Sequence, residues 1–509
     1  MNKATPLPDL VAALEAHRAG RLSEAANVYA EAIALNPTHA DALNLLAVIR
    51  RSEGDGRAAV DLGERAAAAA PERADIRYNL GTARMGIGDH EGAVAAFREA
   101  LAIDPGFADA AANLGIALVA LDRHEEAVAA YEQALVADGT HKIARLNLGN
   151  LLSETGRYDE GAQHLRRCAD LYPDLAEAHY NLAMALLRLG DLRQGFAEYE
   201  WRWRTPGFTS PVRHARIKDW DGRPFAGASL LVHAEQGLGD TIQFLRFLPL
   251  AASLGGRVTL EVQPALARLA KGISGVDRLV AAGSAVGRQD WQSPLMGLPH
   301  RLGLSLGAIP AAVPYLQAEP ERVAFWRTRL KPDGRPLVGV CWQGNRASPV
   351  DKGRSLPDAG LLAPLADVAD VRLVSLVRLT AEQTRPAPTP TGRAVADLPF
   401  TIEYPGADYD AGEDAFVDTA AVLSLCDHVV TTDTAIAHLA GALGRPGLVL
   451  LKAVAEWRWL IARRDTPWYP TLRLVRQTRA GDFAGAIDEA ARLLSARLAF
   501  RSVAGAEEA

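Results

Sequence analysis

Prolines in the first two-fifths of the chain recur every 34 residues, at Pro37, Pro71, Pro105 and Pro173, with Gly139 in the one remaining slot. Small residues keep the same step, at Ala25, Ala59, Ala93, Ala127, Gly161 and Gly195 and again at Ala47, Gly81, Gly115, Gly149 and Ala183. An aromatic residue follows the first set by one helical turn, at Tyr29, Phe97, Tyr131 and Tyr199. Two antiparallel helices approach closely where side chains are small, and proline ends the second helix. The period predicts helix pairs that bury their apolar faces only by stacking on neighbouring pairs.

This pattern resembles the tetratricopeptide repeat (TPR), whose unit is a helix pair of 34 residues. The resemblance spans residues 6–207, and we assign residues 1–207 to an α-solenoid of about five and a half repeats. The concave face of such an array is a binding surface. We therefore expect the chemistry to lie in the remainder of the chain.

Four asparagines keep the same 34-residue step, each in an Asn-Leu-(Gly/Ala) context: Asn79, Asn113, Asn147 and Asn181. The step predicts one row on the concave face, on the first helix of each pair. A carboxamide both donates and accepts hydrogen bonds, so such a row suits an extended polypeptide backbone. The row resembles the asparagine ladder of O-GlcNAc transferase, which holds acceptor polypeptides. The alternative is that Asn-Leu-Gly is common in these repeats and the amide bonds a neighbouring turn.

Composition restricts the class of protein. At 509 residues the chain is too long for one core, and a net charge of −6 gives no support for a nucleic-acid partner. No apolar run is long enough to span a membrane, and Met1–Leu10 lacks the apolar segment of a secretion signal. Cys168, Cys341 and Cys426 lack metal-ligand spacing and fit a reducing compartment. We therefore expect a cytoplasmic protein of several domains.

Turn-forming residues follow the repeats, in Thr205-Pro206-Gly207 and Asp219–Gly227, so we assign residues 208–227 to a linker. The segment before it holds Trp201 and Trp203, and we expect at least one of them to pack on the next domain.

Beyond the linker, short apolar strands alternate with helical segments, which predicts parallel sheets covered on both faces. The predicted strands are Leu230–Ala234, Val258–Val262, Leu337–Trp342, Val371–Val377, Val429–Thr432 and Gly447–Leu451, and the predicted helices Thr241–Leu254, Ala265–Lys271 and Phe483–Leu498. Since the series restarts near residue 333, we assign two α/β domains, 228–332 and 333–500, and a tail, 501–509. We expect the last helix to return to the first sheet and the proline-rich segment Thr380–Arg393 to be a surface loop.

The first predicted strand runs through Glu235-Gln236-Gly237-Leu238-Gly239-Asp240 into a helix. Gly237 and Gly239 let the backbone approach a ligand at this turn, and a helix N-terminus favours negative charge. The segment is not a dinucleotide fingerprint, because Asp240 stands where that motif continues toward a third glycine. By itself it also fits a helix that Asp240 merely caps.

A second such turn follows Val429–Thr432, where Asp433-Thr434 leads at once into a helix that carries His438. Doubly wound sheets bind ligands at the carboxyl ends of their strands. The helix N-terminus favours a phosphate, and Asp433 suits the adjacent loop or a sugar hydroxyl. The alternative is a capped helix with a packed histidine.

Together these segments resemble the heptosyltransferase-type (family 9) glycosyltransferases, which have the GT-B architecture of two Rossmann-like domains facing across a cleft. The resemblance implies that Asp240 is the base and that Asp433, Thr434 and His438 line the donor site, with Ala435 where the family has glycine. It also implies a basic residue that neutralises the donor diphosphate. Arg354 is the first choice and Lys352 the second.

The remaining donor-site residues implied by the resemblance are Gly237, Gly239, Gln343, Asn345 and Trp457, with Arg458 as a reserve phosphate ligand. The segments Tyr199–Trp203, Glu456–Trp459 and Pro467–Pro470 also resemble bacterial proteins that fuse tetratricopeptide repeats to such a domain. Flagellin-modifying transferases are among those proteins.

The resemblance implies an inverting transfer that uses no metal and no cofactor. An acceptor hydroxyl attacks the sugar carbon, Asp240 takes its proton, and Arg354 with the helix N-terminus stabilises the departing phosphate. The expected partners are a nucleotide sugar and an acceptor protein on the concave TPR face. Flagellin and a nonulosonic acid of the pseudaminic- or legionaminic-acid type are the first hypothesis for acceptor and sugar.

Two further hypotheses remain open from the sequence. One is a heptosyltransferase-like enzyme that modifies lipopolysaccharide or another glycan, with the repeats as a docking scaffold. The other is a non-catalytic adaptor whose transferase domain has decayed. Ala435 is the one hint of decay, whereas intact Asp240, Arg354 and His438 argue against it.

Overall fold

The computed structural model describes residues 9–348 and 351–507. The chain divides into two compact units, Met1–Asn181 and Leu182–Ala509. Most of the segment Met1–Leu10, which was searched for a secretion signal, lies outside the described residues.

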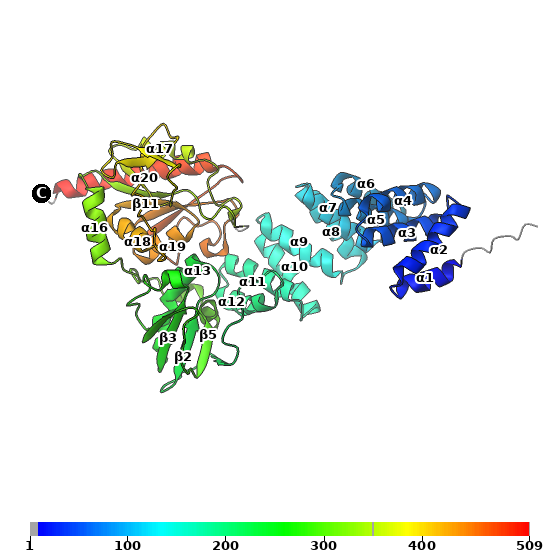
Figure 1. Cartoon of the computed structure of the whole chain (residues 1–509), viewed down its shortest axis with the longest axis horizontal. Helices are drawn as coiled ribbons and strands as arrows, with labels where there is room; N and C mark the ends of the chain where they lie inside the picture. The colour runs from blue at the N-terminus through cyan, green and yellow to red at the C-terminus, as the bar shows by residue number, and fades with distance from the viewer. Residues whose placement is uncertain (1–8, 349–350, 508–509) are drawn as a thin grey trace, which may run out of the picture. The chain divides into compact units, whose positions relative to one another are not determined.

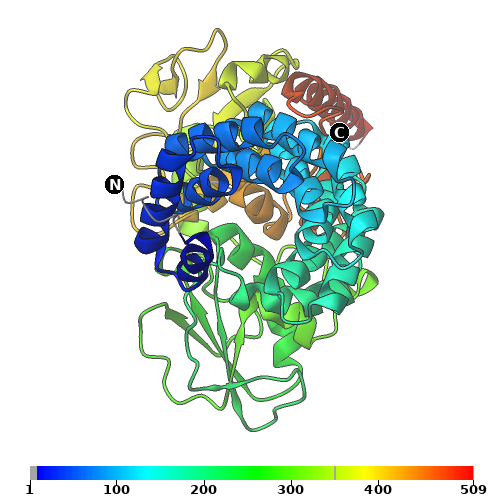
Figure 2. The ribbon, with the colours of Figure 1, turned by 90° about the vertical axis from the view of Figure 1, so that its right-hand side faces the viewer.

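Helix pairs follow one another from the start of the described chain (Figure 1), and they continue along a curved path (Figure 2). The pairs are α1 (Leu10–Arg18) with α2 (Leu22–Leu35), α3 (Ala40–Ser52) with α4 (Gly56–Ala69), α5 (Ala74–Gly86) with α6 (His90–Ile103), α7 (Ala108–Ala120) with α8 (His124–Ala137), α9 (Lys142–Glu154) with α10 (Tyr158–Leu171), and α11 (Ala176–Leu189) with the shorter α12 (Leu192–Tyr199). A 3-10 turn, η1 (Glu200–Arg204), ends the series. The predicted solenoid of helix pairs is confirmed.

Close contact between the helices of a pair depends on the predicted small residues. A Cβ atom added to Gly81 would stand 2.6 Å from the Phe97 ring, and one added to Gly115 would stand 2.4 Å from the Tyr131 ring. Both rings are buried. In these two repeats the glycine and the aromatic residue therefore occupy one layer, as their shared 34-residue step predicts.

The turn inside each pair shows a further 34-residue step that the sequence analysis did not use. Its residues have positive φ, at Gly20, Gly54, Gly88, Asp122, Gly156 and Gly190. Glycine adopts this left-handed conformation without steric penalty and commonly ends a helix in it. Asp122, with φ of 56°, is the one member of the set with a side chain.

The second unit contains two sheets. The first has five parallel strands in the order β1-β5-β2-β3-β4. These are β1 (Lys218–Asp219), β2 (Ser229–His233), β3 (Arg257–Val262), β4 (Arg278–Ala281) and β5 (Trp291–Pro294). Strand β1 lies inside the predicted linker 208–227, where Trp220 is buried and its N–H donates to the Gln292 carbonyl at 2.8 Å. The linker is therefore part of the first sheet.

The second sheet has the order β13-β12-β11-β6-β7-β10-β9-β8. Neighbours from β13 to β10 pair in parallel, and β9 and β8 add an antiparallel edge. The strands are β6 (Leu337–Cys341), β7 (Arg372–Ser375), β8 (Thr384–Pro386), β9 (Arg393–Val395), β10 (Ile402–Glu403), β11 (His428–Thr432), β12 (Gly447–Leu451) and β13 (Leu472–Arg476). The segment Thr380–Arg393, predicted to be a surface loop, consists mostly of turns and irregular backbone, but it also contains β8 and the first residue of β9.

Helices and 3-10 turns cover both sheets. They are α13 (Leu238–Phe244), η2 (Leu245–Phe247), α14 (Leu248–Ala252), η3 (Pro264–Leu266), η4 (Leu295–Gly297), α15 (Leu298–Arg301), η5 (Leu306–Ala308), α16 (Pro320–Leu330), η7 (Ala359–Leu362), α17 (Ala363–Ala366), α18 (Val417–Leu425), α19 (Ala435–Ala442), η8 (Trp457–Trp459) and α20 (Phe483–Glu507). The chain is thus an α-solenoid followed by an α/β part, as predicted.

Two helix predictions need correction. The predicted helix Ala265–Lys271 is one 3-10 turn, η3. Helix α20 contacts strands β12 and β13 of the second sheet and also helix α17. It does not return to the first sheet. It extends to Glu507, so residues 501–507 of the predicted tail are helical.

The last helix pair is shared between the units, since α12 and η1 belong to the second. We expected Trp201 or Trp203 to pack on the part of the chain after the repeats; both are half-buried, and the Trp203 ring packs edge-on against Phe208, with centroids 4.8 Å apart. The fully buried side chain between them is Arg202, and Phe196 and Tyr199 are buried beside it. In the described ranges, no helix combines the length and apolar character needed to cross a bilayer.

Candidate active site

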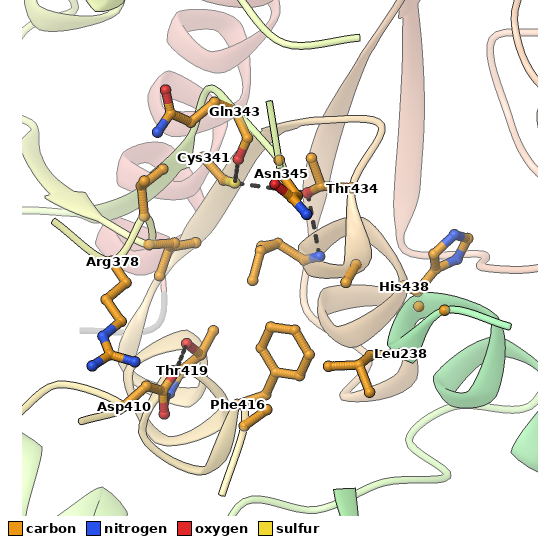
Figure 3. Close-up of a pocket in the computed structure, with 18 of the residues that line it drawn as sticks. Leu238, Cys341, Gln343, Asn345, Arg378, Asp410, Phe416, Thr419, Thr434 and His438 are labelled. Atoms are coloured by element: carbon orange, nitrogen blue, oxygen red, sulfur yellow. Dashed lines mark hydrogen bonds between the residues drawn. The ribbon is translucent and has the colours of Figure 1, made fainter. Parts of the chain in front are cut away.

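The carboxyl ends of strands from both sheets face one cavity of about 820 Å³. Figure 3 shows Leu238 of α13 and His438 of α19 on one side of it, with Arg378 and Asp410 on the other. The predicted residues that line it are Gly237, Gly239, Asp240, Gln343, Asn345, Arg354, Asp433, Thr434, His438 and Arg458. Segments more than 200 residues apart in the sequence thus meet at this cavity.

The glycine turn after β2 lies against the start of α19. A Cβ atom added to Gly239 would stand 3.2 Å from the Cα atom of Ala435 and 3.2 Å from Cδ2 of His438. Because Gly239 has no side chain, the extra methyl group of Ala435 fits where the resembling family has glycine. The departure at Ala435 therefore leaves the two helix N-termini in contact.

The Asp240 carboxylate has two neighbours inside the protein. Its Oδ2 atom accepts a hydrogen bond from the Gly237 N–H at 3.0 Å, and its Oδ1 atom pairs with Nη2 of Arg458. Nε of Arg458 donates to Oε1 of Gln243 at 2.7 Å, which fixes the guanidinium. Asp240 does cap α13, yet its side chain stays 21% exposed and lines the cavity. Capping and access to a ligand are thus compatible.

Arg354 reaches the cavity between two carboxylates. Its Nη2 atom lies 2.7 Å from Oε1 of Glu456, and its Nε atom lies 3.8 Å from Oδ2 of Asp433. The Nε atom is buried and has no hydrogen-bond partner. A buried N–H without an acceptor is energetically unfavourable. An anionic ligand would satisfy it.

Carboxylates and a second arginine surround Arg354, and burial and charge shift the carboxylate pKa values in opposite directions. Burial alone would raise the pKa of Glu456, but Arg354 and Arg458 lower it overall, so Glu456 is ionised at neutral pH. Burial raises the pKa of Asp433 even though Arg354 acts in the other direction. The cluster thus contains two arginine cations next to carboxylates in one cavity.

His438 is a neutral wall of the cavity. Burial lowers its pKa well below the ordinary value, and Arg458 and Arg246 lower it further. Its Nδ1 atom lies 3.0 Å from the Tyr469 hydroxyl, and its ring stacks on Trp459 with centroids 5.5 Å apart. A neutral imidazole offers a hydrogen bond but no charge to a phosphate.

Thr434 caps the N-terminus of α19, because its Oγ1 atom accepts a hydrogen bond from the Ile436 N–H at 3.3 Å. Asn345 lies beside it and Gln343 lies next to Cys341, both on the loop after β6 (Figure 3). The positive end of the helix dipole therefore points toward the same space as Arg354.

Two predicted donor-site residues are not in the cavity wall. Trp457 is 1% exposed and packs edge-on against Phe196, with ring centroids 5.5 Å apart. Lys352 is exposed and does not line the cavity. In the tight turn η8 the tryptophans point into the core, whereas Arg458 reaches the cavity. Within Glu456–Trp459, the reserve ligand Arg458 therefore lines the cavity, and Trp457 does not.

The opposite wall was not predicted. It includes Arg378, Asp410 and Phe416, whose φ of 65° is left-handed. The available signal was the triplet Asp408-Tyr409-Asp410, because carboxylates two residues apart can bind a divalent cation. Here Asp408 pairs with Arg329, and Asp410 accepts from the Asp418 N–H at 2.9 Å. Among the described residues, no group of three or more His, Cys, Asp or Glu side chains has the arrangement of a metal site.

The asparagine row has the predicted register, since its members hold equivalent positions in their helices: Asn79 in α5, Asn113 in α7, Asn147 in α9 and Asn181 in α11. Its amides contact the preceding repeat. Nδ2 of Asn79 donates to Oδ1 of Asn44 at 3.0 Å, and Nδ2 of Asn113 donates to the Tyr78 hydroxyl at 3.1 Å. One N–H of each of these two amides is thus used inside the protein.

Comparisons with known proteins also divide the chain into a repeat part and a second part, each with its own family match. Residues 10–74, 78–142 and 146–200 match the family described as Tetratricopeptide repeat, and residues 411–481 match Glycosyltransferase family 9 (heptosyltransferase). The latter range contains Asp433, His438 and Arg458. Protein FlbA of Caulobacter vibrioides is 28% identical over 320 residues, which cover 59% of this chain and 52% of FlbA. The chain thus spans about half the length of this curated relative.

Solved structures resemble only part of the chain. The crystal structure of YrrB, described as a TPR protein with an unusual peptide-binding site, is 22% identical, covers 35% of this chain and 91% of its own, and has a TM-score of 0.32. Pseudomonas aeruginosa pilF is 19% identical, covers 38% of this chain and 87% of its own, and has a TM-score of 0.35. At such TM-scores these likenesses carry no argument about the site. Separate segments of the chain thus match two families, tetratricopeptide repeats in residues 10–200 and glycosyltransferase family 9 in residues 411–481.

Proposed function

We propose that this chain is an inverting glycosyltransferase that moves a sugar from a nucleotide-sugar donor to Ser or Thr of a protein held by the repeats. The observation that carries the proposal is the cavity in which Asp240 of one Rossmann-like domain faces Arg354 and the α19 N-terminus of the other. The match of residues 411–481 to glycosyltransferase family 9 supports the same reaction class.

Asp240 is the proposed base. The acceptor hydroxyl gives its proton to the Asp240 carboxylate as its oxygen bonds to the anomeric carbon. The bond from that carbon to the phosphate oxygen breaks on the opposite face, so the configuration inverts. Arg458 holds the carboxylate in place through Oδ1, and the Gly237 N–H holds Oδ2.

Arg354 and the N-terminus of α19 are the proposed electrostatic partners of the leaving group. Negative charge grows on the phosphate as it departs, and fixed positive groups in a closed space stabilise it. The unpaired Nε–H of Arg354 is the donor best placed for that oxygen. We propose that these groups stand in for a divalent metal and that no cofactor takes part.

Protein capture is the proposed role of the repeats. Tetratricopeptide arrays bind other proteins through extended concave surfaces, and residues 10–200 match that family over most of their length. We propose flagellin as the acceptor and a nonulosonic acid of the pseudaminic- or legionaminic-acid type as the sugar, from the resemblance to flagellin-modifying transferases. We place the reaction in the cytoplasm, which suits the three free cysteines, all buried.

Transfer to a purified protein tests the proposal. The full chain is incubated with flagellin and a nucleotide-activated nonulosonic acid, and the acceptor mass is measured with and without EDTA. A mass increase of one sugar per modified site, unchanged by EDTA, is the expected result. Loss of transfer in EDTA that manganese restores would refute the metal-free mechanism. Transfer to a lipopolysaccharide acceptor but to no protein would favour the glycan hypothesis, and no turnover of any donor would favour the adaptor.

A further inference from the structure

The last helix of the repeat array, α12, and the turn η1 that follows it contact both Rossmann-like domains inside the second compact unit. Arg202 of η1 and Tyr199 of α12 contact Glu235 and Gln236, which belong to the turn Glu235–Asp240 that presents the proposed base. None of the residues that make these contacts lines the cavity, so they do not touch a bound donor.

Arg202 of η1 forms a two-pronged ion pair with Glu235. Its Nη2 atom lies 2.7 Å from Oε1 and its Nε atom 3.3 Å from Oε2 of Glu235. The Arg202 side chain is 0% exposed and that of Glu235 is 2% exposed. Nη1 also contacts Oε1 of Glu200 at 2.7 Å. A planar guanidinium that bonds a carboxylate at two points fixes orientation as well as distance.

The next residue of the turn is held in an unfavourable conformation. Gln236 has a φ of 59°, which a residue with a side chain adopts only when its surroundings enforce it. Its Nε2 atom donates to the Tyr199 hydroxyl at 2.9 Å, and its backbone N–H donates to Oγ of Ser210 at 3.1 Å. The backbone N–H of Gly237, the residue that follows, donates to the Asp240 carboxylate.

The same helix pair also touches the second Rossmann-like domain. The Phe196 ring packs edge-on against both Phe244 of the first domain and Trp457 of the second, at centroid distances of 6.1 and 5.5 Å. Nε of Arg188 donates to the Ala455 carbonyl at 3.2 Å. The residues around Trp457 include Arg458, which pairs with Asp240. The helix pair thus supports both partners of that ion pair.

We propose that Arg202 is a positioning residue that sets the place of Asp240 through Glu235 and Gln236, so that the end of the repeat array is a working part of the catalytic unit. This role rests on the proposed transfer. A misplacement of about 1 Å at a reacting group can lower a rate on the order of 100-fold. Loosening the turn should therefore slow the chemical step and leave substrate binding in place.

Variants of the full chain at Arg202 test this role. Arg202→Met removes the charge and keeps an apolar chain of similar length, whereas Arg202→Lys keeps the charge but not the second contact. Arg372→Met is the matched control. Arg372 is also a buried arginine, and its Nη2 atom lies 2.7 Å from Oε2 of buried Glu403, but neither residue lines the cavity. Hydrogen–deuterium exchange of residues 234–244 and steady-state transfer kinetics are measured for all three variants.

We expect Arg202→Met to speed exchange across residues 234–244 and to lower kcat on the order of 100-fold, with the KM of donor and acceptor changed by about twofold or less. Arg202→Lys should restore part of kcat, and Arg372→Met should lose thermal stability but keep kcat. A raised acceptor KM with unchanged kcat in Arg202→Met would overturn the proposal and leave the repeats as a docking site. Equal loss of kcat in the control would overturn it as well. If the wild type transfers no sugar, the proposed function is refuted, but the proposed role of Arg202 is not. Unchanged hydrogen–deuterium exchange in the Arg202 variants would separately refute the role of Arg202 in positioning Asp240.

Discussion

The repeat array and the cavity differ in how many times each structural position occurs in the sequence. In the array each structural position occurs several times, so Gly81 against Phe97 and Gly115 against Tyr131 are two examples of one contact. In the cavity every position occurs once, and Asp240 meets Arg458 across a sequence separation of 218 residues. A change in the array should therefore alter stability by a modest amount, whereas a change in the cavity should alter chemistry by a large factor.

The largest effect is expected at Asp240. Asp240→Asn keeps the size of the side chain and its hydrogen bond from Gly237 but removes the base, which typically contributes about 10²–10⁴-fold to a rate. We expect transfer to fall by that factor, while donor affinity by calorimetry and the melting temperature stay near the wild-type values. Normal turnover would leave Asp240 as a helix cap only, and the cavity would lose its distinguishing chemistry.

Arg354 should come next. Arg354→Ala removes the unpaired Nε–H and leaves Arg458 as the remaining arginine beside Glu456 and Asp433, so donor binding should weaken by about 1.5–3 kcal/mol. Calorimetric titration with the nucleotide sugar measures the change. Lys352→Ala is the matched control, since Lys352 is basic, nearby in sequence and outside the cavity wall. Equal losses in both variants would indicate a general charge effect instead of one site.

Most of the fold followed from the sequence because periodic and alternating patterns record local geometry. The cavity followed less completely. Asp433 and Thr434 stand at a strand end and could be placed, but the sequence does not record which way Trp457 and Arg458 point in a 3-10 turn. The wall around Phe416 depends on a left-handed backbone conformation, which a phenylalanine in the sequence does not predict. Such features arise from packing between distant segments, which a single sequence does not display.

The asparagine row bears on whether the array is more than a scaffold. Any one Asn→Ala change should weaken acceptor binding by about 0.5–1.5 kcal/mol, and all four together should weaken it far more, because contacts along one extended peptide share one ordering cost. Capture of the acceptor by full-length protein in the Asp240→Asn background measures this without turnover. Asn44→Ala is the control, since it breaks the bond to Asn79 and leaves the row intact. Equal capture by the wild type and the quadruple variant would make the row structural.

Gly115 tests the repeated contact itself. In Gly115→Ala the new Cβ atom would stand 2.4 Å from the buried Tyr131 ring, so we expect a loss of about 1–2 kcal/mol despite the better helix propensity of alanine. Gly86→Ala is the control, because Gly86 ends α5 with nothing within 4 Å of an added Cβ atom. It should be neutral or slightly stabilising. Urea unfolding followed by helical circular dichroism measures both, and a stable Gly115→Ala protein would show that the layer can expand.

The smallest effect is expected at the one turn that departs from the glycine period. Asp122 adopts a φ of 56° where the other repeats have glycine, and its pairing with His124 is loose, at 3.8 Å between exposed groups. Asp122→Gly should relieve the left-handed strain and stabilise the array by about 0.5–1 kcal/mol, an amount limited by the greater freedom of glycine in the unfolded chain. The reverse change, Gly156→Asp at a φ of 93°, should destabilise by a similar amount. If Asp122→Gly lowers the urea midpoint instead, the carboxylate has a function at that turn, and the equivalence of the repeats ends there.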